Sequence, residues 1–217
     1  TRTIIRVLQN VYDDLFADMV HIGREDSAIR LFKADNYHQE IKFSWDESKQ
    51  TNINRPIEVN AVLFFLKNDI IKYVDTILEL EGKDKWSEGI YPNYHIDSRN
   101  FEMMNNHLNS QGIPLMYVGN RIGSLEDADN YNKIVIMTYH SSKGLDFDAV
   151  ALPNIEADLS TTSNENALIL VALSRAKRDL LITYTNTMYS GYERFLVNTP
   201  KREINNLGTD DGEIIIN

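Results

Sequence analysis

The run AVLFFL at residues 61–66 is the stretch that decides the fold class. It holds six consecutive apolar residues, with the polar residues Asn60 before it and Lys67 after it. An uninterrupted apolar run of this length is typical of a strand buried on both faces of a parallel sheet. Residues 70–80 follow with apolar positions at helical spacing, so a strand followed by a helix is predicted, with Asn68 or Asp69 as the helix cap.

The same order of strand and helix continues toward the C-terminus. Helices are predicted over residues 99–110, 166–177 and 189–197. Short apolar runs predict strands at residues 28–33, 115–118, 134–137, 149–152 and 180–184. Apolar strands that alternate with helices predict an α/β fold with a mainly parallel sheet flanked by helices.

The remaining segments have less regular patterns. Residues 3–20 have the spacing of a helix, and the alternation of Ile41, Phe43 and Trp45 favours a second early strand over residues 40–45. Residues 46–60 are polar, with room for a short helix. The segment 200–217 is interpreted as a polar tail that ends in a short strand at residues 214–216.

Composition excludes several classes of protein. The chain has 217 residues, of which 42% are hydrophobic and 25% charged, as is ordinary for a globular protein. It contains no cysteine, so disulfides, thiol catalysis and cysteine-based zinc sites are excluded. It contains no run of about 18 apolar residues, so no membrane span is predicted and no membrane partner is expected. These features fit a cytoplasmic protein.

The charge balance limits how the chain can bind nucleic acid. There are 32 acidic and 22 basic residues, which gives a net charge of −10. A small domain that binds nucleic acid by bulk electrostatics is expected to be basic. Any such contact must therefore come from a local patch or from a neighbouring domain.

The stretch IVIMTYHSSKGLDFDAV at residues 134–150 carries the first set of candidate functional residues. A buried strand leads into hydroxyl residues, Lys143 and Gly144, and ligands in parallel α/β sheets bind beyond the carboxyl ends of strands. Small side chains, a lysine and a glycine at that point allow close approach to phosphates or to a nucleic-acid backbone. On the residues alone, an ordinary loop with a glycine turn is an equal alternative.

The stretch NALILVALSRAKRDLLI at residues 166–182 carries the second set. It is interpreted as an apolar helix that ends in Ser174, Arg175, Lys177 and Arg178. An arginine held at the end of a buried helix can reach the charge that develops on a phosphate. Lys177 and Arg178 are interpreted as cations that complement the helix C-terminus.

Together the two stretches resemble motifs V and VI of the UvrD/Rep-type helicases of superfamily 1. The first follows the motif V pattern T-x-H-x-x-K-G-L-E-F, and the second follows the motif VI pattern V-A-x-T-R-A. The start Thr1-Arg2-Thr3 resembles motif IV, and residues 61–66 resemble the apolar strand that follows it. The matching residues are Thr138, His140, Lys143, Gly144, Leu145, Asp146 and Phe147, then Val171, Ala172, Ser174, Arg175 and Ala176. Asp146 stands where the family has glutamate, and Ser174 where it has threonine.

The resemblance implies a second RecA-like (P-loop NTPase-like) motor domain over residues 1–199. This domain would close over ATP and Mg²⁺ bound mainly by an N-terminal RecA-like domain of the same protein. Arg175 and Arg2 would be catalytic contacts to the γ-phosphate. Residues 143–146 would bind the nucleotide through Lys143, Gly144, Leu145 and Asp146. Thr138, His140 and Ser141 would face single-stranded DNA.

Missing motifs qualify this hypothesis. The chain has no G-x-x-x-x-G-K-S/T sequence, so on its own it is expected not to hydrolyse ATP. The short stretch between Arg2 and Thr138 leaves no room for the large accessory domain of UvrD and Rep. That favours a compact branch such as helicase IV or the HelD proteins, which act on RNA polymerase. A HelD-like factor that binds RNA polymerase and a non-catalytic binding module remain as alternatives.

No metal site is predicted within the chain. His95 and His107 lack the spacing of metal ligands and are interpreted as surface or packing residues. Trp86, Tyr91 and Tyr94 are interpreted as covering an edge of the core, and stacking on bases is the alternative.

Overall fold

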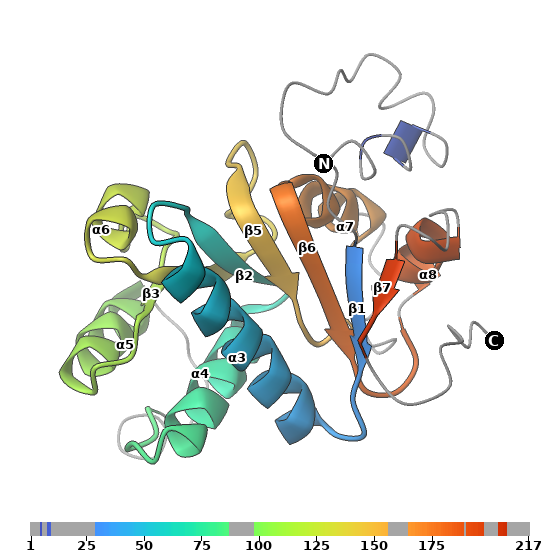
Figure 1. Cartoon of the computed structure of the whole chain (residues 1–217). Coiled ribbons are helices and arrows are strands. Elements are labelled where there is room, and N and C mark those ends of the chain that lie inside the picture. The colour runs from blue at the N-terminus through green and yellow to red at the C-terminus, as the bar shows by residue number, and fades with distance from the viewer. Residues whose placement is uncertain are drawn as a thin grey trace.

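The computed structural model describes residues 29–86, 98–155, 165–188, 190–197 and 204–207, together with Ile5, Leu8 and Gln9. Within them, seven strands form one sheet in the order β3-β4-β2-β5-β6-β1-β7, and every neighbouring pair is parallel (Figure 1). This confirms the predicted α/β fold. The strands are β1 Ile29–Lys33, β2 Asn60–Phe64, β3 Leu115–Tyr117, β4 Ile134–Thr138, β5 Phe147–Leu152, β6 Ala176–Tyr184 and β7 Ile204–Asn206.

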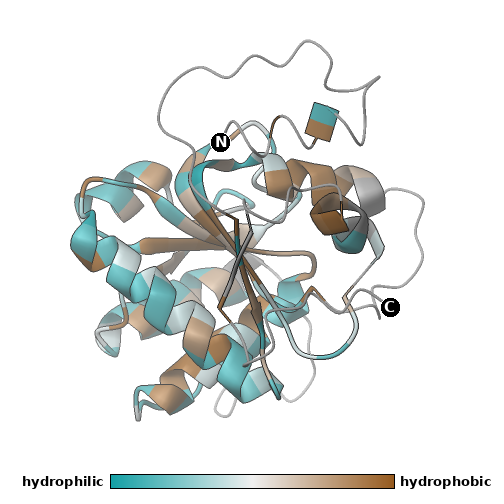
Figure 2. Ribbon diagram, turned by 45° about the vertical axis from the view of Figure 1, so that its right-hand side comes forward, coloured by the Kyte–Doolittle hydropathy of each residue, from teal (hydrophilic) through white to brown (hydrophobic). Residues whose placement is uncertain are grey.

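Helices cover both faces of the sheet. Alternate residues of β2 divide the core, because Val62 packs with the helices of one face and Leu63 with those of the other. The side chains of the strands therefore form an apolar layer between two helical layers, visible as brown strands in Figure 2. The helices on the Val62 face are α3 Tyr37–Asn54, α4 Lys67–Leu80 and α5 Ser98–Ser110; those on the Leu63 face are α6 Leu125–Asn130, α7 Glu165–Ser174 and α8 Ser190–Val197.

The register of β2 fixes the course of the loop that joins β4 to β5. Phe64, at the end of β2, pairs with Thr138 of β4, whereas Asn60, at its start, pairs with Ala149 of β5. Residues 139–146 therefore run from the carboxyl end of β4 back to the amino end of β5. We call these two sides of the sheet the carboxyl edge and the amino edge.

The predicted strand at residues 40–45 is wrong, because these residues belong to α3. The Asn36 side chain caps this helix by accepting a hydrogen bond from the Gln39 backbone N–H at 2.9 Å. Ile41 and Trp45 lie four residues apart and are both buried, which is one face of a helix. Phe43 lies beside that face and stacks on Phe32 of β1, with ring centroids 3.8 Å apart.

Three local expectations differ from the structure near the ends of helices. The helix α7 ends at Ser174 and β6 begins at Ala176, so Lys177 and Arg178 lie in a strand and do not complement a helix end. The cap position of α4 is Leu66 and not Asn68 or Asp69, and the Asp69 carboxylate accepts a hydrogen bond from the Leu66 backbone N–H. The short helix α6 was not predicted, because Ala128 is its single buried residue; its cap, Ser124 accepting from the Asp127 N–H, was the available signal.

Some expectations fall on parts of the chain outside the described residues. Of the helix predicted over residues 3–20, the structure describes Ile5, Leu8 and Gln9, and Leu8 is buried in the core. Arg2 and the strand predicted at residues 214–216 lie outside. Within the predicted polar tail, residues 204–206 form β7, which pairs with β1. Among the described helices, none combines the length and the apolar composition that crossing a membrane requires.

Candidate functional site

The Arg175 guanidinium is held at the amino edge, between the end of α7 and the loop before β5. Its Nε donates to the Val171 carbonyl at 2.9 Å, Nη1 to the Leu145 carbonyl at 2.7 Å, and Nη2 to Ser174 Oγ at 2.8 Å. The Arg175 carbonyl also accepts from the Phe147 N–H at 3.0 Å, which joins it to the start of β5. The guanidinium is therefore oriented by bonds to the protein before any ligand arrives.

Part of the guanidinium stays available for a ligand. Arginine has five N–H donors, and the three bonds above engage three of them. Within the described residues, Asp146 Oδ1 lies near the remaining donors, 3.5 Å from Nη1. The Asp146 side chain is 59% exposed and that of Arg175 is 18% exposed, so this ion pair is largely hydrated and weak. An anion with higher charge than a carboxylate can replace Asp146 at little cost.

Lys143 and Gly144 connect this edge to the rest of the loop. Gly144 has a φ of +83°, a left-handed conformation that glycine adopts without strain, and open space surrounds the position of a Cβ. Lys143 is exposed, and its backbone N–H donates to the His140 carbonyl at 3.4 Å. The sequence-predicted nucleotide residues 143–146 thus include two contacts of Arg175, the Leu145 carbonyl and the Asp146 carboxylate.

Thr138, His140 and Ser141 lie together at the carboxyl edge. Thr138 is buried, and its Oγ1 accepts from the Ser141 N–H at 3.2 Å and donates to Ser141 Oγ at 3.0 Å. The Thr138 hydroxyl therefore shapes the turn and does not point to solvent. His140 is exposed and Ser141 partly so, which leaves these two to meet a ligand.

The loop 139–146 thus carries two groups of predicted site residues on opposite sides of the sheet. The expectation that the whole stretch lies beyond the carboxyl ends of strands holds for Thr138, His140 and Ser141. Leu145 and Asp146 instead lie beside the amino ends of β5 and β6, where Arg175 binds them. The structure places these three residues together, and Arg2 lies outside the described residues.

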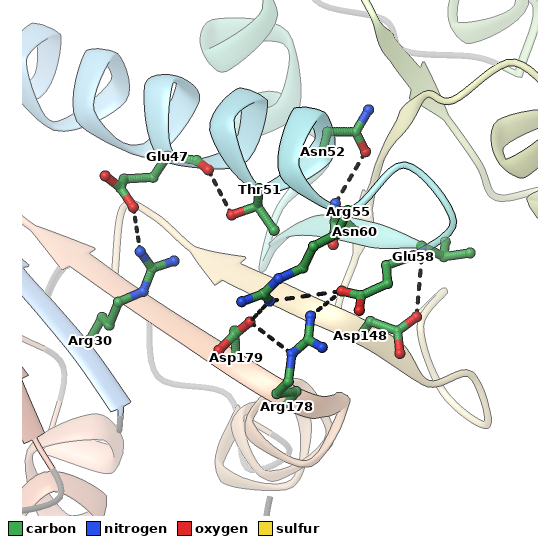
Figure 3. Close-up of polar contacts among 11 residues, drawn as sticks. Arg30, Glu47, Thr51, Asn52, Arg55, Glu58, Asn60, Asp148, Arg178 and Asp179 are labelled. Atoms are coloured by element: carbon green, nitrogen blue, oxygen red, sulfur yellow. Dashed lines mark hydrogen bonds and ion pairs between the residues drawn. The ribbon is translucent and has the colours of Figure 1, made fainter. Parts of the chain in front are cut away.

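A network of ion pairs lies beside Arg175 on the amino edge. Arg55, after α3, pairs with Asp179 of β6, and Arg178 of β6 pairs with Glu58 and with Asp179 at 3.2 Å (Figure 3). Asp148 of β5 accepts from the Val59 N–H at 3.2 Å. These contacts join the start of β2 to the first residues of β5 and β6, so they hold the segment from which Arg175 extends.

The comparisons with known proteins concern the part of the chain that carries this arrangement. Residues 104–187 match the family model of the UvrD-like helicase C-terminal domain. The matched range includes the loop 139–146 and Arg175. Over these residues the chain is similar to the C-terminal domain of UvrD-like helicases. In Figure 1 the matched range runs from within α5 to the end of β6 and the residues just after it.

Two curated proteins to which this chain is similar are DNA helicases by name. One is the ATP-dependent DNA helicase Rep of Buchnera aphidicola, 33% identical over 89 residues, which are 34% of this chain. The other is DNA helicase II of Rickettsia typhi, 33% identical over 91 residues, which are 36% of this chain. The matches span 14% of the length of each relative. Neither name refers to RNA polymerase, so the HelD-like branch and that partner stay predictions.

A solved structure supports the fold of the chain. The C-terminal domain of a possible DNA helicase from Lactobacillus plantarum WCFS1 has a TM-score of 0.52 and 13% sequence identity to this chain. The similarity covers 95% of this chain and 96% of that one. At this level of identity the likeness concerns the fold alone.

Two of the residues considered for other sites, His107 and Trp86, have packing roles. His107 Nε2 lies 2.8 Å from the Asp84 carbonyl, and its ring contacts Trp86, which is buried. The packing interpretation of His107 and Trp86 is confirmed. No group of three His, Cys, Asp or Glu side chains within the described residues has the arrangement of a metal site. His95, Tyr91 and Tyr94 lie outside those residues.

Asp179 is expected to make the stability of the protein depend on pH. Burial alone would raise its pKa, but hydrogen bonds and charges from Arg55 and Arg178 outweigh burial and hold the pKa below its ordinary value. A carboxylate with a lowered pKa stabilises the fold above its unfolded pKa of about 3.9, and that contribution is lost as pH falls through the lower folded pKa. Asp179→Asn is expected to lower the free energy of unfolding at neutral pH by about 1–3 kcal/mol.

Urea unfolding between about pH 7 and pH 3 measures this effect. The wild type is expected to lose more stability than Asp179→Asn over the acid part of that range. Asp129→Asn, at an exposed position of α6, serves as the matched control with wild-type behaviour. If the free energy of unfolding falls equally with pH in the wild type and in Asp179→Asn, the lowered pKa of Asp179 is contradicted.

Proposed function

We propose that this domain completes the ATP site of a DNA helicase, with Arg175 as a catalytic contact to the γ-phosphate. ATP would be held mainly by an N-terminal motor domain of the same protein, together with Mg²⁺, which neutralises phosphate charge. The observation that carries the proposal is the fixed guanidinium of Arg175, oriented by the Leu145 and Val171 carbonyls with N–H donors left over. A preorganised cation lowers the cost of the transition state because it needs no reorientation as charge develops.

The loop 139–146 supplies the rest of the proposed nucleotide contacts. The open space around Gly144 and the exposed side chain of Lys143 allow approach to phosphates. Asp146 would face the ribose or would give up Arg175 to the γ-phosphate. Its side chain is one methylene shorter than the glutamate of the family, which favours the second role. Arg2 is proposed as the second catalytic contact on the strength of its motif alone.

We propose that the carboxyl edge contacts single-stranded DNA through His140 and Ser141, with Thr138 shaping the turn. The support is the exposure of His140 beside a hydroxyl that is partly exposed, and the engagement of Thr138 Oγ1 within the turn. Backbone contacts of this kind position a strand without reading its sequence. The domain would then hold DNA on one edge of the sheet and the nucleotide on the other.

The ATPase rate of the complete protein that contains this domain tests the function. We expect ATP hydrolysis that single-stranded DNA stimulates strongly, and no hydrolysis by the 217-residue chain alone, because it lacks a Walker A sequence. Hydrolysis that DNA leaves unchanged would contradict the DNA assignment and favour the alternative of a factor that acts on RNA polymerase. A complete protein without ATPase activity would contradict the enzyme assignment and favour a binding module.

A further inference from the structure

The turn at residues 119–122, after β3, has a strained backbone. Gly119 and Ile122 close it with two backbone hydrogen bonds, of 3.0 and 2.9 Å. Between them, Asn120 has a φ of +49° and Arg121 a φ of +66°. Left-handed backbone is unfavourable for residues with a Cβ; asparagine tolerates it better than arginine, and glycine adopts it without strain. An arginine at position 121 therefore costs stability in a turn that glycine would satisfy.

This turn lies against the loop 139–146. A Cβ on Gly119 would be 3.0 Å from Ser141 Oγ and 2.9 Å from Tyr117 Oη, so a larger residue there would force these hydroxyl groups to move. Asn120 Nδ2 donates to Tyr117 Oη at 3.4 Å, which holds the turn on the end of β3. Gly119 therefore lies against Ser141 of the predicted DNA-binding turn, and Arg121 is two residues further along the chain on the same carboxyl edge.

Arg121 also differs from the other described arginines in its charged neighbours. Arg121 is exposed, as are His140 and Lys143 on the adjoining loop. The four other arginines whose side chains the structure describes each pair with a carboxylate: Arg30, Arg55, Arg175 and Arg178. Within the described residues Arg121 has no such partner. The acidic residues Glu126 and Asp127 begin α6 soon afterward, so the positive surface is local.

We infer that Arg121 contacts the phosphate backbone of single-stranded DNA and extends the surface formed by His140 and Ser141. The inference rests on the proposed function of the carboxyl edge. The planar guanidinium matches two oxygens of one phosphate, and the contact positions the strand without selecting bases. A local cation of this kind also explains how a chain with a net charge of −10 can meet a polyanion.

Arg121→Gly separates binding from structure, because the two roles predict opposite changes in stability. If the arginine serves binding, glycine relieves the strain and raises the melting temperature of the 217-residue chain by about 2–4 °C. The same change in the complete protein reduces affinity for labelled oligo(dT) of about 20 nucleotides, a length above common site sizes. We expect affinity to fall roughly three- to ten-fold, and the slope of log affinity against log salt to shrink by about 0.7, the value for one phosphate contact.

Lys83→Ala is the matched control. Lys83 is an exposed cation, and the carbonyl of its neighbour Asp84 contacts His107 near the end of α5. The chain enters β3 from that end of α5, whereas Arg121 follows the opposite end of β3. The control is expected to keep wild-type affinity and salt slope. His140→Ala is expected to weaken binding independently of Arg121.

The outcomes distinguish the inference from the proposed function. If wild type binds oligo(dT) and His140→Ala weakens binding while Arg121→Gly does not, the inference about Arg121 is wrong and the proposed DNA surface stands. A melting temperature that falls in Arg121→Gly, with unchanged affinity, assigns the arginine to structure. If the wild-type complete protein does not bind oligo(dT), the proposed surface fails and Arg121 loses its role with it.

Discussion

Arg175→Ala in the complete protein is expected to reduce DNA-stimulated ATP hydrolysis about a thousand-fold or more, while ATP binding stays nearly unchanged. An arginine supplied to the γ-phosphate from outside the main nucleotide site acts on the transition state, because negative charge on the transferring group is greatest there. The ground-state nucleotide would be held chiefly by the other motor domain. The kcat from steady-state kinetics and the affinity for a fluorescent nucleotide measure the two effects separately.

Two further variants test whether a lower rate in Arg175→Ala results from a folding defect. Arg175→Lys keeps a positive charge but loses the planar fork that binds both the Leu145 and Val171 carbonyls, so an intermediate rate is expected. Lys177→Ala removes an exposed cation two residues away and is expected to retain wild-type kcat. A kcat near the wild-type value in Arg175→Ala would contradict the catalytic role.

Trp45→Ala is expected to lower the free energy of unfolding by roughly 3–5 kcal/mol, the largest loss of stability predicted for this domain. The indole is 1% exposed and packs between α3 and the sheet. Its Nε1 donates to Glu81 Oε1 at 2.6 Å, and Lys49 Nζ lies 5.1 Å from the ring centroid. Removal of the ring leaves a cavity and deprives Glu81 of a donor.

Trp45→Phe is the matched control for that experiment. Phenylalanine keeps most of the packing and loses the hydrogen bond to Glu81, so a smaller loss of about 1–2 kcal/mol is expected. Urea unfolding followed by circular dichroism is the suitable measurement, because fluorescence would change with the loss of tryptophan itself. Equal losses for alanine and phenylalanine would show that the bond to Glu81, and not the buried ring, carries the stability.

The strands could be predicted from the sequence where burial is complete on both faces. The run at residues 61–66 is an example, since β2 is buried at all five of its positions. The segment at residues 40–45 could not, because Ile41 and Trp45 satisfy both an alternating pattern and a spacing of four residues. The Asn36 cap and the packing of the Trp45 side chain in the core favour the helix over a strand. Such packing depends on residues far away in the sequence.

The candidate site shows the same limit. Arg175 and the loop residues were found from their motifs, yet the bond between Arg175 and the Leu145 carbonyl joins residues 30 positions apart. The ion pair of Glu58 with Arg178 joins residues 120 positions apart. Charged residues at such separations have many possible partners, so no local sequence pattern could have indicated either of these two contacts. Arg121 was not identified either, because the strain at its backbone is a property of the folded turn.

The strand β7 has a consequence for how this domain should be produced. Residues 204–206 occupy the outer side of β1 and pair with its backbone groups. A chain shortened to residue 199 would leave those groups of β1 as an open strand edge, which is a site for pairing between molecules and for aggregation. A chain that includes residues 204–206 instead ends this side of the sheet in a strand of three residues, which offers fewer backbone groups for such pairing.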